Sequence, residues 1–132
     1  MSLDYFLSKI NSNKKIIIEI KDDNEKIVHI LNRTISKYNL NFYICSFNYD
    51  LMVLFKKNYS RYKSGLIIGY MLNYDKIHNN FDFNLLHYNL INRVNLTKEN
   101  FIWTVNNNKI YDKIINKNKN IYIISDKSYL LK

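Results

Sequence analysis

The chain has 132 residues and a formal net charge of +9, and 47% of its residues are hydrophobic. This length and composition are typical of one globular domain with its own core, so we predict a single domain over residues 1–132. The sequence has no apolar run near the roughly 20 residues that cross a bilayer, and residues 1–10 lack a basic signal-peptide start. The single cysteine, Cys45, excludes an intrachain disulfide. Together these features predict a cytoplasmic protein.

The positive charge makes nucleic acid one class of partner to weigh. The chain is also rich in Asn, Lys, Ile and Tyr, whose codons are AT-rich. The base composition of the genome is therefore another explanation of the positive charge. Basic residues are scattered, and the densest stretch, 109–119, is diluted by asparagine. A solvated basic surface is therefore favoured over a dedicated nucleic-acid site.

Short strand-like runs recur along the chain. After a short helix over residues 3–10, for which Ser2 is a candidate N-cap, they cover residues 15–21, 42–47, 65–70, 101–106 and 121–126. Helical patterns lie between most of these runs, at residues 27–35, 51–55 and 110–115. The stretch 72–96 is the least regular, with a short strand predicted at 81–86 and a short helix at 90–96. This alternation predicts an α/β fold with parallel strands, whose functional groups lie at the carboxyl ends of the strands.

The first strand ends in a charged pair. Glu19 and Lys21 share one face of the strand, opposite the face of Ile16, Ile18 and Ile20. If helices cover the isoleucine face, the charged pair points into the space that the sheet encloses. Buried charges are costly unless they are paired or bind a ligand, so we favour a binding site over an edge strand with a wet face.

Four segments, in this order, resemble the later part of the glycerophosphodiester phosphodiesterase family. Ile18–Lys21 is similar to the family's "IEIK" strand, Ser46–Asp50 to its "SF-D" strand end, Phe101–Asn106 to its "V-WTVN" strand and Ile123–Asp126 to its "IITD" strand. The resemblance implies an incomplete TIM-type (β/α) barrel of about six parallel strands, equivalent to strands three to eight. The family's first two β/α units, with their His-Arg-Gly and Glu-x-Asp motifs, have no counterpart in this sequence.

The resemblance also implies roles for particular residues. Glu19 matches a carboxylate that binds a divalent cation, for which Mg²⁺ or Ca²⁺ is expected, and Lys21 matches a lysine that approaches the substrate phosphate. Trp103 matches a tryptophan of the substrate pocket, with a core aromatic as the alternative, and Phe47 is a further candidate for substrate binding. No catalytic residue is identified, because the three histidines, His29, His78 and His87, match none of the family's motifs.

Three other polar residues fall at predicted strand ends. Ser46, Asn106 and Asp126 lie where a ligand would bind, but caps and turns explain Asn106 and Asp126 equally well.

The resemblance implies metal-dependent hydrolysis of glycerophosphodiesters, with a glycerophosphodiester or a phospholipid-derived small molecule as ligand. Because one metal ligand of three and neither catalytic histidine are matched, we expect weak or no activity from the chain alone, and whether it is an enzyme stays open. The alternatives are a non-catalytic family member that binds a phosphodiester or a partner and, less favoured, a basic nucleic-acid-binding module. Because six strands leave the barrel incomplete, we predict either self-association through its open edges or an open, curved sheet.

Overall fold

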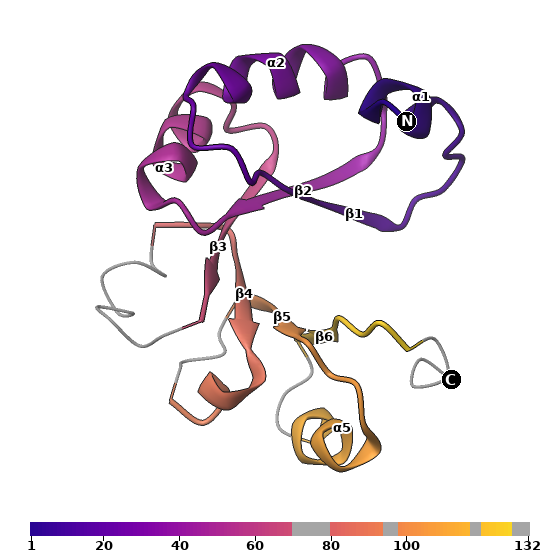
Figure 1. Cartoon of the computed structure of the whole chain (residues 1–132), viewed down its shortest axis with the longest axis vertical. Coiled ribbons are helices and arrows are strands. Elements are labelled where there is room, and N and C mark those ends of the chain that lie inside the picture. The colour runs from indigo at the N-terminus through magenta and orange to yellow at the C-terminus, as the bar shows by residue number, and fades with distance from the viewer. Residues whose placement is uncertain (70–79, 94–97, 117–119, 128–132) are drawn as a thin grey trace. The chain divides into compact units, whose positions relative to one another are not determined.

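The computed structural model describes residues 1–69, 80–93, 98–116 and 120–127 (Figure 1). The strands lie in one sheet in the order β1-β2-β3-β4-β5-β6, the same as their order along the chain. The three strand pairs with a described register, β1–β2, β4–β5 and β5–β6, are parallel. This topology is that of an incomplete TIM-type (β/α) barrel, as predicted.

The chain divides into two compact units, Met1–Gly65 and Leu66–Lys132. The prediction of one domain over residues 1–132 stays a prediction. Among the helices of the described ranges, none is long and apolar enough to cross a bilayer.

The first unit alternates helices and strands. Its elements are α1 (Leu3–Ser8), β1 (Lys15–Glu19), α2 (Lys26–Ile35), β2 (Asn41–Ser46) and α3 (Tyr49–Asn58), followed by the start of β3 (Lys63–Ile68). The predicted N-cap Ser2 is confirmed, because its Oγ accepts a hydrogen bond from the Tyr5 backbone N–H at 3.2 Å. Asn48 caps α3 in the same way, accepting from the Leu51 N–H at 3.0 Å.

Helices of the first unit cover one face of β1 and β2. Phe42, which is paired with Ile16, contacts the ring of Tyr62, and Tyr62 contacts Phe55 of α3. The face that carries Ile16 therefore packs on helices. Glu19 lies on the opposite face, because strand side chains alternate.

The helix predicted at 27–35 is confirmed, but its expected apolar face, which included Ile30, is partly wrong. The helix buries Val28, Leu31 and Ile35, whereas the side chain of Ile30 is 52% exposed. Residues 28, 31 and 35 follow the i, i+3, i+7 spacing of one helical face, so Val28 rather than Ile30 points to the sheet.

The second unit holds the later strands. Its elements are the end of β3, then β4 (Phe83–His87), the 3-10 helix η1 (Tyr88–Leu90), β5 (Glu99–Trp103), α5 (Asn108–Ile115) and β6 (Ile121–Ile123). The strand predicted at 81–86 is thus confirmed, with bounds shifted to 83–87. The helix predicted at 90–96 is wrong in its described part, because Leu90 is the last residue of η1 and residues 91–93 form a turn. Residues 94–97 lie outside the described ranges.

Several predicted strand ends differ from the structure, and β6, predicted to residue 126, ends at Ile123. β3 begins at Lys63, and the predicted last residue Tyr70 lies outside the described ranges. β5 ends at Trp103, three residues before the predicted end at Asn106. Beyond Trp103 the chain still bonds to its neighbour, because the Val105 N–H donates to the Ile124 carbonyl at 3.0 Å.

The strands β4 and β5 present two different faces. Asn84 and Leu86 of β4 pair with Asn100 and Ile102 of β5, and all four side chains are almost fully buried. The other face carries mainly aromatic and apolar groups, namely Phe83, Leu85 and His87 of β4 with Phe101 and Trp103 of β5. On this face Phe83, Leu85 and Phe101 are buried, whereas His87 and Trp103 at the carboxyl end and Glu99 at the amino end of β5 are half-exposed.

Candidate functional site

The charged pair Glu19 and Lys21 lies at the carboxyl end of β1. The Lys21 Nζ atom is 3.8 Å from the Glu19 Oε2 atom. The side chain of Lys21 is 81% exposed and that of Glu19 is 35% exposed, so the expectation that both are enclosed is wrong. Lys21 follows the last residue of β1 by two positions and extends beyond the paired strands. An ion pair this exposed is weak, so the ammonium and the carboxylate can each exchange it for a ligand.

Cys45 stands opposite Glu19 in the register of β1 and β2. Burial of the thiol, and secondly the charge of Glu19, raise the pKa of Cys45 to about 12. The thiol donates to the Ile18 carbonyl at 3.6 Å. At neutral pH it is therefore protonated, which makes it neither a nucleophile nor a thiolate metal ligand.

Phe47 and Ser46 end β2 in different environments. The side chain of Phe47 is 59% exposed, an uncommon position for a large apolar ring. Ser46 is buried, donates to the Ile20 carbonyl at 2.8 Å and accepts from the Asn48 N–H at 3.1 Å. Ser46 therefore joins the ends of β1 and β2, whereas the ring of Phe47 lies mostly at the surface.

Trp103 is the half-buried last residue of β5, in the second unit. Its indole Nε1–H donates to the Leu85 carbonyl at 3.2 Å, which fixes the ring against β4. His87, the register partner of Trp103, lies with its ring centroid 5.1 Å away at an interplanar angle of 83°. His87 was not among the site residues predicted from the sequence. The sequence feature that could have identified it is the alternation of Phe83, Leu85 and His87, in which two apolar residues of one strand face are followed by a polar ring.

Asn106 and Asp126 form a turn-stabilising cluster. The Asn106 side chain donates to the Asp126 carboxylate at 3.0 Å and accepts from the Asp126 backbone N–H at 3.0 Å. Ser125 donates its hydroxyl to the same Asn106 oxygen at 3.2 Å. These hydrogen bonds tie the chain after β5 to the chain after β6, which favours the turn interpretation of both residues.

The other histidines lie elsewhere. His29 is an exposed residue of α2 whose Nδ1 lies 2.6 Å from the Tyr59 hydroxyl. His78 lies outside the described residues. Within the part of the chain that the structure describes, no three His, Cys, Asp or Glu side chains gather into a cluster that could hold a metal ion.

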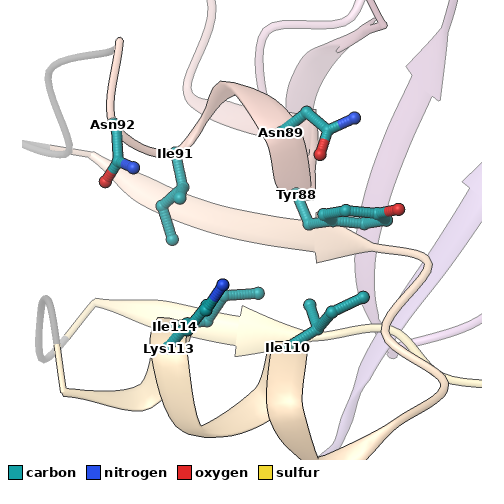
Figure 2. Close-up of a pocket in the computed structure, with 7 residues that line it drawn as sticks. All are labelled: Tyr88, Asn89, Ile91, Asn92, Ile110, Lys113 and Ile114. Atoms are coloured by element: carbon teal, nitrogen blue, oxygen red, sulfur yellow. The ribbon is translucent and has the colours of Figure 1, made fainter.

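A cavity of about 410 Å³ lies between η1 and α5 in the second unit (Figure 2). Isoleucine side chains 91, 110 and 114 line it together with Tyr88 and Lys113. Figure 2 shows the Tyr88 ring across from Ile110 at one end of the cavity. None of these residues was predicted as a site residue.

No family model matches the chain, and no curated protein matches it in sequence. Solved structures of similar fold include the following three. A protein of Galdieria sulphuraria that is provisionally assigned as a glycerophosphodiester phosphodiesterase has a TM-score of 0.77 at 13% identity, covering 98% of this chain and 60% of that one. A glycerophosphodiester phosphodiesterase of Parabacteroides distasonis has a TM-score of 0.66 at 16% identity, covering 85% of this chain and 52% of that one.

The third is an Oleispira antarctica phosphodiesterase in complex with its product sn-glycerol 3-phosphate, with a TM-score of 0.61 at 13% identity. It covers 77% of this chain, which spans 46% of that protein. The chain thus spans about half the length of the structures it resembles. At identities of 13–16% the likeness shows the fold alone. It confirms that the chain resembles glycerophosphodiester phosphodiesterases in fold.

Proposed function

We propose that this chain is a glycerophosphodiester phosphodiesterase-like protein that binds the glycerophosphate part of a glycerophosphodiester. The observation that carries the proposal is the exposed Glu19–Lys21 pair at the carboxyl end of β1. Two further facts support it: function in (β/α) barrels sits at the carboxyl ends of strands, and a similar fold has been crystallised with sn-glycerol 3-phosphate.

Lys21 is the proposed phosphate-binding residue. Its ammonium is largely exposed, and among the described residues it is held only by the 3.8 Å contact to Glu19. A phosphodiester or phosphomonoester oxygen closer than this would form a shorter, charge-assisted hydrogen bond. Phe47, exposed at the end of the neighbouring strand, is the proposed apolar contact in the same unit.

Glu19 is the proposed ligand of a divalent cation. A carboxylate suits Mg²⁺ or Ca²⁺, but these ions take at least six ligands, usually from several oxygen-bearing groups. The described residues offer Glu19 without a cluster of further acidic side chains. These residues alone therefore do not fit a metal site, and we derive no hydrolytic step through a metal.

Trp103 is the proposed substrate contact of the second unit. Because its Nε1–H is bonded to the Leu85 carbonyl, the ring offers a fixed apolar surface at the carboxyl end of β5. A rigid aromatic side chain loses little conformational entropy when a small molecule packs on it.

Hydrolysis by the chain alone is expected to be weak or absent. Each acid or base group that is missing from such a reaction costs a factor of about 10² to 10⁴ in rate.

The expected location is the cytoplasm, and the buried free thiol of Cys45 supports this expectation. Self-association through sheet edges stays a prediction.

The binding proposal is tested by titrating sn-glycerol 3-phosphate into the isotope-labelled chain and following backbone amide shifts. Wild-type protein should show saturable shifts around residues 19–23, and Lys21→Met should weaken binding by about tenfold or more, the loss typical of a charged hydrogen bond. Lys14→Met, which removes an exposed lysine before the amino end of β1, is the matched control. Absence of saturable shifts at millimolar ligand would refute the proposal.

Activity is tested with glycerophosphocholine in the presence of Mg²⁺ or Ca²⁺, with Glu19→Ala beside the wild-type chain. We expect no hydrolysis above the buffer rate from either protein. Metal-dependent hydrolysis that disappears in Glu19→Ala would contradict the expected inactivity and would assign Glu19 to a working metal site.

A further inference from the structure

His87 occupies the same strand-end position in β4 that Trp103 occupies in β5. The two residues are register partners in parallel strands, so their side chains leave the sheet side by side on one face. The residues before them on this face, Leu85 and Phe101, are buried, whereas His87 and Trp103 are half-exposed. The pair therefore forms the solvent-facing carboxyl end of this strand face.

The imidazole of His87 is held in a defined orientation. Its Nδ1 accepts a hydrogen bond from the Asn89 backbone N–H at 3.3 Å. The Tyr88 ring lies against it at a centroid distance of 4.3 Å, and Trp103 meets it edge to face at 5.1 Å. Because Nδ1 is the acceptor, the neutral ring carries its proton on Nε2. Among the described residues, no hydrogen-bond partner of Nε2 is found.

We infer that His87 is a ligand-binding residue beside Trp103 in the second unit, and that its Nε2–H donates a hydrogen bond to an oxygen atom of a glycerophosphate group that packs on the Trp103 ring. This inference rests on the proposed function and adds a polar contact to it. Trp103 has its own N–H bonded to the backbone, so its ring supplies surface but no donor from Nε1. A glycerophosphate has both kinds of group that this pair suits, a three-carbon chain and oxygen acceptors.

Capping η1 accounts for only one of the two ring nitrogens. Nδ1 serves as the cap acceptor of η1, a task that a shorter Asn side chain also performs. The second nitrogen and the contact with Trp103 have no part in that cap. An amide side chain can imitate either nitrogen: the Asn amide reaches the position of Nδ1, and the longer Gln amide reaches that of Nε2.

This difference gives a test that separates capping from binding. Trp103 is the only tryptophan of the chain, so its fluorescence reports on the site during a titration with sn-glycerol 3-phosphate. His87→Asn retains the cap acceptor and should bind about tenfold more weakly than wild type. His87→Gln retains a donor at the Nε2 position and should bind within about threefold of wild type, a difference below one ordinary hydrogen bond. Thermal unfolding of each variant verifies that it is folded.

The outcomes are distinct. Weak binding by His87→Asn together with near-normal binding by His87→Gln supports the inference. Wild-type affinity in both variants, or a loss confined to His87→Gln, overturns the inference and leaves the proposed function standing. If the wild-type chain itself neither changes its Trp103 fluorescence nor shows amide shifts with the ligand, the proposed function fails and the inference fails with it.

Discussion

The side-chain amide of Asn84 donates a hydrogen bond to the side-chain oxygen of Asn100 at 3.0 Å, inside the second unit. Both side chains are almost fully buried, and Asn100 also donates to the Lys98 carbonyl at 2.6 Å. The two residues are register partners in β4 and β5. A buried amide pair is stabilising only while each partner satisfies the other, so this pair specifies the alignment of the two strands that carry His87 and Trp103.

Asn84→Leu should destabilise the fold, because it leaves the Asn100 oxygen buried without its donor. The expected loss is about 1–3 kcal/mol of the free energy of unfolding, measured by denaturant titration. The double variant Asn84→Leu, Asn100→Leu removes both partners and should recover much of this loss. Additive losses in the double variant would show that the two amides do not depend on each other.

The sequence predicted the strands well because each is a short apolar run, and it predicted the cap Ser2 because capping is local. It also predicted correctly that Glu19 and Lys21 share a face, since that follows from the period of a strand. Their exposure was not predictable, because it depends on how far the paired part of β1 extends.

His87 illustrates what local patterns miss. It lies in a stretch without clear periodicity. His87 becomes a candidate site residue only because strand register places it beside Trp103, which is 16 residues later in the sequence. Register between parallel strands is set by packing across a long connection rather than by nearby residues. The resemblance pointed to Trp103 but gave no counterpart for the histidine beside it.

The cap of α3 offers a second test of local stability. Asn48 accepts from the Leu51 N–H and also donates to the Asp23 carboxylate at 3.1 Å, so it connects the loop after β1 to α3. Asn48→Ala should lower the free energy of unfolding by about 0.5–2 kcal/mol. Asn48→Ser retains a cap acceptor and should lose less. Equal losses in the two variants would argue that capping is not what Asn48 contributes.

The thiol of Cys45 should resist modification in the native state. Its pKa of about 12, raised by burial and then by Glu19, leaves almost no thiolate at pH 8. Labelling with a disulfide reagent should therefore be slow in native buffer and fast in denaturant, and the single cysteine makes the signal unambiguous. Glu19→Gln removes the smaller cause and should change the native rate little. Rapid native labelling would contradict the buried position of the thiol.

The raised pKa also has a consequence for stability at high pH. A group whose folded pKa lies above its unfolded value stabilises the fold fully below the unfolded pKa, here near 9.0, and loses that contribution as pH rises toward about 12. Cys45→Ala should therefore reduce the fall in the free energy of unfolding over this alkaline range, measured by denaturant titration at each pH. An unchanged alkaline slope would show that other groups cause the fall.

Asp4 should govern part of the acid response of the first unit. The Lys37 Nζ and Tyr38 hydroxyl lie 3.1 and 2.9 Å from its Oδ1. The hydrogen bond from Lys37, followed by that from Tyr38, lowers the pKa of Asp4 below 3.8. A carboxyl with a lowered folded pKa stabilises the fold above its unfolded pKa, and that contribution is lost as pH falls through the folded value. Denaturant titrations from pH 6 to pH 2 should show this loss in the wild-type chain.

Asp4→Asn should flatten the acid limb of that stability profile, because the amide does not titrate. Asp112→Asn, which alters an exposed carboxyl of α5, should leave the limb as it is in the wild type. The Asp4 contribution is an exposed ion pair assisted by a neutral hydroxyl, so salt should weaken the part due to Lys37 and spare the part due to Tyr38. An acid limb that is identical in wild type and Asp4→Asn at low salt would show that the contact between α1 and Lys37–Tyr38 contributes nothing to acid stability.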